Sequence, residues 1–319
     1  MPPETPLVSV LVPSFNKAQY IEETLESVYA QTLAQTARIE IIVVDDGSTD
    51  GSPALLERHK DRCTVILGPN RGASAARQTA LEHARGEHIQ YLDADDLLLP
   101  RALELQTDAL EASGADVSYG DWQRFTRNAH GAFVRGDVVA ARIDAVDSDP
   151  EIACFRHFWS PPAALLYRRT LTARLPVWHS ALPVIQDARY LQDAAFAGAR
   201  FVHVPELVAL YREDAGNSLS KGSKKKFVRD MLTNGCEVEA LWRARGELSE
   251  PQRRALEDTY SAGARMIFEE DDALFEECYA SYRGVGGRGA LRWPVLTHGL
   301  KSVLGKQRAT AVLRALKKL

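Results

Sequence analysis

Four short apolar runs, separated by segments with helical spacing, occupy the first 120 of the 319 residues. Each run is rich in β-branched residues and bounded by turn residues, which predicts a buried strand. The runs are VSVLV (8–12), IEIIVV (39–44), CTVIL (63–67) and HIQYL (88–92). Between the first two, Ile21, Leu25 and Val28 recur at helical intervals. Such alternation predicts an α/β fold, with a mostly parallel sheet flanked by helices.

The pattern changes after residue 120. DWQRF and GAFVRG predict a hairpin, IQDARYLQDAAFAG predicts a helix, and ARFVHVPELVALYR predicts two short strands around Pro205. From about residue 222 onward the apolar spacing is helical. We therefore expect one domain over residues 1–215 and a helical C-terminal region over residues 216–319.

Charge is distributed unevenly along the chain. The 39 Lys and Arg residues against 43 Asp and Glu give a net charge of −4, which excludes a surface devoted to nucleic acid. After Glu277 the chain has nine basic residues and no acidic one. Residues 290–319 form a basic amphipathic pattern, typical of a helix lying on anionic lipid. A helix packed on its own domain or in a homodimer would show the same pattern.

Several common signatures are absent from the sequence. The first glycine is Gly47, so neither GxGxxG nor a P-loop follows the first predicted strand, which argues against a dinucleotide-binding oxidoreductase and a P-loop NTPase. The four cysteines are far apart and form no CxxC motif, which speaks against a zinc cluster or a disulfide framework. We find no signal peptide and no apolar stretch of about 18 residues. These features predict a cytoplasmic protein.

Carboxylates follow two of the predicted strands, in the segments DDGSTD (45–50) and DADD (93–96). The first segment is also typical of an ordinary turn and helix cap. The second is harder to explain in that way, because converging carboxylates repel one another unless a cation neutralises them. Mg²⁺ is commonly shared between one or two carboxylates and substrate phosphates, so DADD predicts a metal and diphosphate site. Asp96 is equally suited to cap the helix expected to begin near Pro100.

Several segments in this order resemble the family 2 inverting glycosyltransferases of GT-A fold. They are VSVLVPSFNKAQYIEETLESVYAQT, IIVVDDGSTDG, NRGASAARQTALEHARGEHIQYLDADDLLLP and the later IQD and YR, and they span roughly residues 6 to 215. The resemblance implies a Rossmann-like, mostly parallel central sheet with a C-terminal helical extension. It also implies transfer of a sugar from a nucleotide-diphosphate donor, most simply a UDP-sugar. The acceptor would be a hydroxyl of a glycan or lipid-linked molecule in bacterial surface polysaccharide synthesis.

The resemblance also implies residues that hold the nucleotide. Phe15 would stack on the base, and Asp46 would accept a hydrogen bond from a uracil N–H, with Pro13 and Asn16 shaping the turn. Phe15 could equally be a core aromatic residue under the first helix. Arg77 would lie near the base or the diphosphate, where a guanidinium suits phosphate oxygens, or else on the helix surface.

The metal site follows from the same resemblance. Asp95 would bind Mn²⁺ or Mg²⁺ directly, and Asp93 would contact the ribose or reach the metal through water. Relatives often read YRxH where this chain has YRED, so Asp214 could supply an oxygen ligand in place of the histidine. Arg212 and the basic loop 221–226 could close over the diphosphate.

An inverting transferase needs one base to take the proton of the acceptor hydroxyl. In the family this base is the aspartate of an ED pair that opens a helix; here the pair is Gln186-Asp187, so Asp187 is the candidate and Asp193 the substitute. A plain helix-start aspartate, stabilised by the helix dipole, explains Asp187 as well. The chain lacks the QxxRW motif of processive synthases, which favours single transfers. Two other functions remain open: a nucleotidyltransferase that makes the donor, and a catalytically silent module that binds a nucleotide sugar or a membrane.

Overall fold

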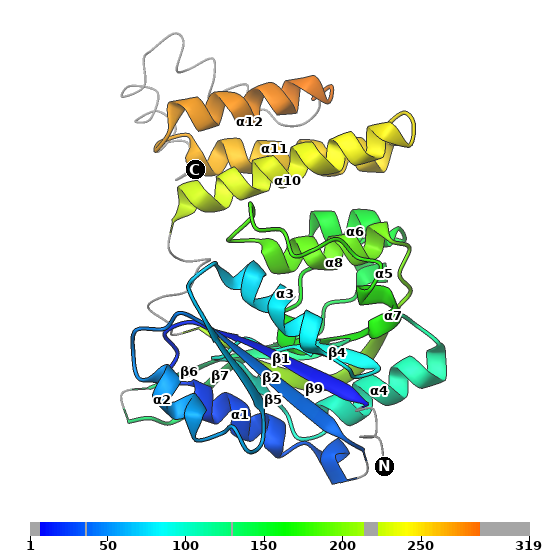
Figure 1. Cartoon of the computed structure of the whole chain (residues 1–319). Helices are drawn as coiled ribbons and strands as arrows, with labels where there is room; N and C mark the ends of the chain where they lie inside the picture. Colours follow the sequence, from blue (N-terminus) through cyan, green and yellow to red (C-terminus); the bar gives the residue numbers. More distant parts are fainter. Residues whose placement is uncertain (1–6, 36, 129, 214–222, 288–319) are drawn as a thin grey trace. The chain divides into compact units, whose positions relative to one another are not determined.

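The computed structural model describes residues 7–35, 37–128, 130–213 and 223–287. The chain divides into two compact units, Met1–Gly216 and Asn217–Leu319. The first unit is a nine-stranded sheet with helices on both faces, and the described part of the second is helical (Figure 1).

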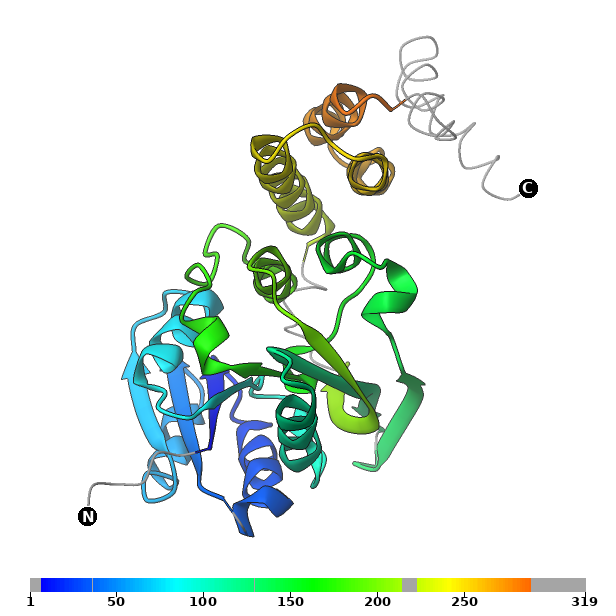
Figure 2. The same ribbon diagram turned by 90° about the vertical axis from the view of Figure 1, so that its right-hand side faces the viewer.

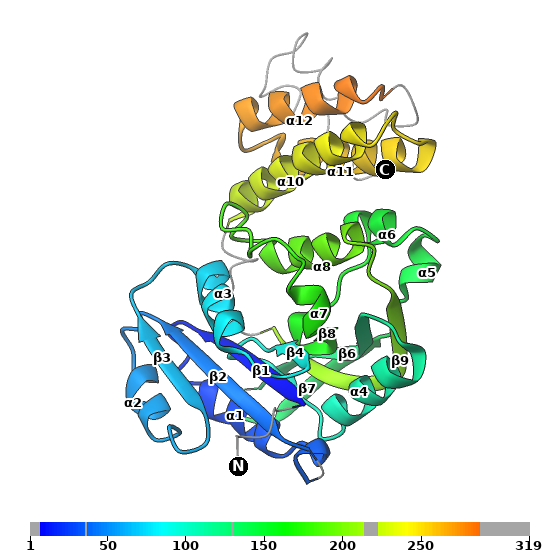
Figure 3. The same ribbon diagram turned by 45° about the vertical axis from the view of Figure 1, so that its right-hand side comes forward.

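Four parallel strands form one half of the sheet, and all four were predicted from the apolar runs. They are β1 (Val8–Ser14), β2 (Ile39–Asp46), β3 (Thr64–Gly68) and β4 (His88–Tyr91). Their spatial order is β3-β2-β1-β4, which Figure 3 shows with β3 at the left. Because these strands run parallel, their carboxyl ends meet at one edge of the sheet, where ligands bind in open α/β folds. The segments PSFN, DDGS and DADD therefore lie together at that edge.

The other half of the sheet is mixed. Beyond β4 the order continues β8-β6-β9-β5, and β7 pairs with β6 as the predicted hairpin. The bounds are β5 (Leu97–Leu98), β6 (Val117–Arg127), β7 (Phe133–Val139), β8 (Leu165–Arg168) and β9 (Phe201–Arg212). The prediction of two strands around Pro205 is wrong, because β9 is continuous. Its register against β6 skips Pro205 and Glu206, and at such an irregularity the missing proline N–H costs no ladder hydrogen bond.

Side chains alternate between the two faces of the parallel strands. Val8, Val10 and Val12 pack in one core, and Leu11 packs in the other. The first core is covered by α1 (Ile21–Tyr29), α2 (Ser52–Glu57) and α4 (Ala102–Ser113), and the second by α3 (Ala73–His83), α6 (Pro150–Arg156) and α8 (Gln186–Phe196) (Figure 1). The shorter elements are η1 (Thr32–Gln35), α5 (Ile143–Val146), η2 (Pro162–Ala164) and α7 (Arg169–Thr172). The α/β fold class is confirmed, and so is the helix predicted from IQDARYLQDAAFAG.

The second unit contains α10 (Lys224–Ala244), α11 (Glu250–Ile267) and α12 (Asp272–Gly284), which Figure 2 shows side by side. Each helix has a side-chain N-cap, supplied by Ser223, Ser249 and Asp271. At Gly235 of α10, a Cβ atom would lie 2.8 Å from the ring of Tyr260, so these helices cross closely there. The helical spacing expected from residue 222 is confirmed, whereas the basic segment 290–319 lies outside the described residues.

Candidate active site

The turn after β1 is tied to the turn after β2. Asn16 has a φ of 52°, in the left-handed region that Asn tolerates better than most residues. Its backbone N–H donates to Ser48 Oγ (2.8 Å), and its Oδ1 accepts from the Thr49 N–H (2.8 Å). Pro13 is buried in β1, and Phe15 is 44% exposed. The exposure of Phe15 argues against the core position that was one of its two interpretations.

The two aspartates that end β2 hold two different loops. Asp45 accepts hydrogen bonds from the backbone N–H (2.8 Å) and the hydroxyl (2.6 Å) of Ser48, within its own turn. Asp46 accepts the backbone N–H groups of Arg71 and Gly72, one on each oxygen, at 2.8 Å. The carboxylate of Asp46 therefore fixes the loop that leads into α3, and each of its oxygens keeps a further lone pair for another donor.

Two cations pair with the aspartates that follow β4. Arg77 Nη2 forms an ion pair with Asp93 Oδ1, and Lys17 Nζ forms one with Asp95 Oδ2. Arg77 is 5% exposed, and its guanidinium lies 4.8 Å from the centre of the Trp178 ring. Arg77 is therefore a buried charge and not a residue of the helix surface. The predicted pair Asp93 and Asp95 is neutralised here by side chains from α3 and from the turn after β1.

Asp96 lies below this pair, almost fully buried. Its Oδ1 accepts the backbone N–H of Arg212 at 2.9 Å, and its Oδ2 has no hydrogen-bond partner among the described residues. Burial raises the pKa of Asp96 well above its ordinary value, and the neighbouring Asp95 and Asp93 raise it further. The alternative that Asp96 caps the next helix is wrong, since α4 has Arg101 at its N-cap.

Arg212 supports the acidic loop from beneath. Its side chain is fully buried, its Nε donates to the backbone carbonyl of Asp95 (2.7 Å), and its Nη2 pairs with Glu23 (2.9 Å). The guanidinium lies 4.5 Å from the ring centre of Tyr20 and 4.4 Å from that of Phe125. These contacts hold the main chain of the DADD segment in place.

Asp187 opens α8 and reaches the same region. Its Oδ2 accepts a hydrogen bond from Trp159 Nε1 at 3.2 Å. Burial raises the pKa of Asp187 above its ordinary value; the positive charge of Arg77 opposes that rise, and the negative charge of Asp93 adds to it. The structure therefore brings the predicted base close to Asp93 of the acidic loop, with Arg77 interacting electrostatically with both.

Gln186 precedes Asp187, at the position where the resemblance implies a glutamate. Its Oε1 accepts from the Ser74 hydroxyl (2.5 Å), and its Nε2 donates to the carbonyl of Pro183 (3.1 Å). This neutral side chain links the start of α8 to the start of α3. The substitute base Asp193 is buried instead in an ion pair with Arg189, whose Nε lies 2.9 Å from Asp193 Oδ1.

Some predicted residues lie outside the described residues, namely Asp214, residues 221–222 of the basic loop and the segment 290–319. Within the described ranges, no group of three or more His, Cys, Asp or Glu side chains is arranged to hold a metal ion.

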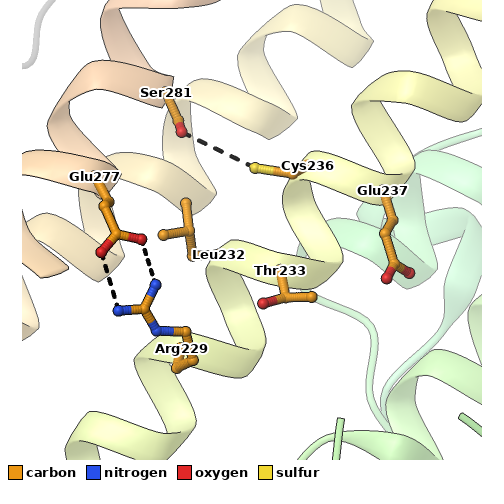
Figure 4. A pocket seen from close by; sticks show the side chains of 7 residues that line it. All are labelled: Arg229, Leu232, Thr233, Cys236, Glu237, Glu277 and Ser281. Atoms are coloured by element: carbon orange, nitrogen blue, oxygen red, sulfur yellow. Dashed lines mark hydrogen bonds and ion pairs between the residues drawn. The ribbon is translucent and has the colours of Figure 1, made fainter. Parts of the chain in front are cut away.

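A separate cavity of about 460 Å³ lies in the second unit (Figure 4). Two of its lining residues, Arg229 and Glu277, form an ion pair with each other. Its lining consists of Arg229, Leu232, Thr233, Cys236, Glu237, Glu277 and Ser281. None of the residues predicted for the site contributes to it.

Two residues of the site were missed in the sequence. Lys17 directly follows the PSFN turn and pairs with Asp95 of the acidic loop. Its place next to that motif was the signal available in the sequence. Trp159 lies 28 residues before Asp187 in an irregular segment, and no local pattern points to it.

Comparison with known proteins identifies the family. Residues 9–153 match the model of Glycosyl transferase family 2. The uncharacterized glycosyltransferase EpsJ of Bacillus subtilis is 37% identical over 232 residues, which cover 68% of this chain and 63% of EpsJ. The UDP-Glc:alpha-D-GlcNAc-diphosphoundecaprenol beta-1,3-glucosyltransferase WfgD of Escherichia coli is 33% identical over 125 residues, or 39% of this chain and 48% of WfgD. The chain thus spans less than two thirds of the length of either relative.

Among solved structures, the mannosyltransferase PcManGT from Pyrobaculum calidifontis, in complex with GDP-Man and Mn²⁺, superposes with a TM-score of 0.58. The alignment covers 97% of this chain and 84% of PcManGT at 20% sequence identity, so it supports the fold alone. The GT-A fold that the family resemblance implied is confirmed. Through the domain that begins at β1, the chain belongs to glycosyl transferase family 2.

Proposed function

We propose that the chain is a metal-dependent, inverting, non-processive glycosyltransferase. It moves a sugar from a nucleotide-diphosphate donor, with UDP as the preferred nucleotide, to a hydroxyl of a glycan or lipid-linked acceptor in bacterial surface polysaccharide synthesis. The observation that carries this proposal is the proximity of Asp187 to Asp93, with buried Arg77 interacting with both. The name of WfgD gives UDP-glucose as its donor and GlcNAc-diphosphoundecaprenol as its acceptor, which supports this choice of substrates.

The acidic loop is suited to a hard cation. Its side chains offer carboxylate oxygens, and Asp95 and Asp93 already bind the positive groups of Lys17 and Arg77. We assign Asp95 as the direct ligand of Mn²⁺ or Mg²⁺ and Asp93 as a ligand through water or a ribose contact. When bound, the metal would hold the diphosphate and offset the charge that develops on the leaving group. Asp214 remains a proposed third ligand.

The nucleotide would lie along the carboxyl ends of β1, β2 and β4. In this assignment the exposed ring of Phe15 stacks on the base, and Asp46 uses a remaining lone pair to accept from the base. Pro13 and Asn16 set the turn, and Arg77 turns a guanidinium N–H group toward phosphate oxygens. We propose that Arg212 acts on the donor through the backbone of the acidic loop, because its own side chain is fully buried.

Asp187 would act as the general base. Burial raises the pKa of its carboxyl group, and a base works best when its pKa approaches the working pH. Asp187 would take the proton of the acceptor hydroxyl as that oxygen attacks the anomeric carbon, and the nucleotide diphosphate would leave from the opposite face. Inversion follows from this single displacement.

The acceptor also bears on the location of the protein. Among the residues that the structure describes, no helix combines the length and apolarity needed to cross a membrane. We propose that the protein is cytoplasmic and that residues 290–319 bring it to the inner face of the membrane. The alternative, a helix in a homodimer, predicts dimers in solution and no retention on anionic vesicles.

The test of the base uses two aspartates of α8. Asp187→Asn should lower kcat by at least about 10³-fold while leaving the dissociation constant of the donor within about twofold. Asp193→Asn is the matched control, since Asp193 pairs with Arg189, and it should transfer at the wild-type rate. Normal turnover by Asp187→Asn would show that another group is the base. A panel of UDP- and GDP-sugars with Mn²⁺, read by thermal stabilisation, would identify the donor.

A further inference from the structure

We propose that Trp159 is a positioning residue for the transfer: its indole N–H fixes one oxygen of Asp187 and leaves the other to take the acceptor proton. The contact is the hydrogen bond from Trp159 Nε1 to Asp187 Oδ2 at 3.2 Å. The inference deepens the proposed function and rests on the assignment of Asp187 as the base.

The indole of Trp159 is held on several sides. Its ring lies edge-on to Trp122 of β6 (5.3 Å between centroids, 90° between planes) and to Tyr211 of β9 (5.6 Å, 83°). The rings of Trp122 and Tyr211 also meet edge-on, at 5.9 Å and 77°. Prolines 161 and 162 follow after Ser160 and restrict the backbone. Two strands and a proline pair therefore set the direction of one N–H group.

The chemistry of the donor suits a base. An indole N–H can only donate and carries no charge, so it orients a carboxylate without pairing it with a full positive charge. A guanidinium partner would form a stronger, charge-assisted hydrogen bond and reduce the basicity of the carboxylate more. The nearby guanidinium of Arg77 makes its hydrogen bond with Asp93 instead. The arrangement gives Asp187 a fixed orientation from a neutral group.

Other groups also act on the carboxylate of Asp187. Arg77 comes from α3, Asp93 from the loop after β4, and Tyr167 from β8. The backbone N–H of Ala188, in the same helix, donates to Asp187 as well. Only the contact with Trp159 can be removed by deleting one neutral N–H while every charge stays in place.

The test replaces Trp159 with Phe, which keeps an aromatic ring and removes the donor. A hydrogen bond to the ionised form lowers the pKa of a carboxyl group, so its loss should raise the pKa of the base. The acidic limb of the kcat profile should move up by about one pH unit, and kcat at neutral pH should fall about tenfold. The dissociation constant of the nucleotide-sugar donor, measured by calorimetry, should stay within about twofold, because Trp159 contacts no residue that is predicted to bind this donor.

Trp122→Phe is the matched control, because it removes an indole from the same ring cluster and leaves the bond to Asp187 intact. Its acidic limb should stay at the wild-type position. If Trp159→Phe folds poorly, benzothienylalanine at position 159 keeps the bicyclic shape and replaces the N–H with sulfur. It should shift the limb in the same direction.

The failure of this inference can be told apart from the failure of the proposed function. If Asp187→Asn abolishes transfer but neither change at position 159 moves the acidic limb, Trp159 does not position the base. The same conclusion follows if Trp159→Phe raises the KM of the acceptor and leaves kcat unchanged. In the Asp187→Asn background, Trp159→Phe should have no further effect on the residual rate. If Asp187→Asn is fully active, the proposed base itself is wrong.

Discussion

The two halves of the central sheet deliver side chains to the site in different ways. In the parallel half, Asp46, Asp93 and Asp95 stand at or directly after the ends of β2 and β4. In the mixed half, Trp159 comes from a loop and Asp187 from the first turn of a helix. Positions of the first kind are set by the hydrogen-bonded register of the strands, and positions of the second kind by side-chain packing.

This difference suggests a division of labour. We expect changes in the parallel half to affect donor and metal binding, and changes around Asp187 to affect kcat. Arg77 connects the halves, because it pairs with Asp93 and lies within the electrostatic reach of Asp187. Substitutions in each half and at Arg77 can therefore test the division.

The largest effect is expected from the double substitution Asp93→Asn and Asp95→Asn. It keeps the shape of the loop and removes the charges that would hold the cation. Transfer should fall by on the order of 10³-fold or more. Thermal stabilisation by a UDP-sugar with Mn²⁺ should disappear as well, whereas Asp187→Asn should retain it. Metal-dependent stabilisation that survives in the double variant would contradict the division.

A smaller effect is expected at the residue that joins the halves. Arg77→Met removes a buried guanidinium and leaves Asp93 and Asp187 without their shared positive charge. We expect the free energy of unfolding to fall by about 3 kcal/mol, measured by urea denaturation at neutral pH. Arg71→Met is the control, because the side chain of Arg71 is exposed, and it should change stability by less than about 0.5 kcal/mol. Equal losses for both variants would argue against a linking role for Arg77.

The smallest effect is expected from two glycine substitutions, which compare how tightly the two halves are packed. A Cβ at Gly86 would lie 2.5 Å from the backbone nitrogen of Ser9 in β1, and one at Gly120 of β6 would lie 2.5 Å from Val208 Cγ2. A side chain can shift where a backbone cannot, so Gly86→Ala should destabilise by about 2 kcal/mol and Gly120→Ala by about 1 kcal/mol. Adding Val208→Ala should reduce the clash at Gly120 in a double-mutant cycle. A larger loss at Gly120 would reverse the comparison.

The parallel half was predictable because its signals are local. Short β-branched runs mark buried strands, and the acids at their ends fall at one edge whatever the details of packing. The mixed half was less predictable, since whether a strand continues through Pro205 depends on its pairing with a partner strand. A proline in an isolated sequence indicates a break, and only pairing with β6 shows that the strand continues through an irregularity.

The candidate site shows the same limit at the level of single side chains. The sequence pointed to Arg212 as a residue that closes over the diphosphate, and the structure places its side chain beneath the acidic loop. Asp46 was expected to accept a hydrogen bond from a base, and in the structure each of its oxygens accepts a backbone N–H of the loop before α3. Burial and the choice of partner decide these details, and neither has a local signature.

By itself, the sequence determined the α/β class, the four parallel strands and the acidic residues at their ends, because these depend on residue type and on short-range periodicity. The tertiary structure alone decided that Lys17 and Arg77 neutralise the acidic loop, that Asp96 is buried, and that Trp159 donates to Asp187. Those contacts join residues that are far apart in the chain. Such contacts form only when loops and helices pack over the sheet, and the local spacing of residues does not predict that packing.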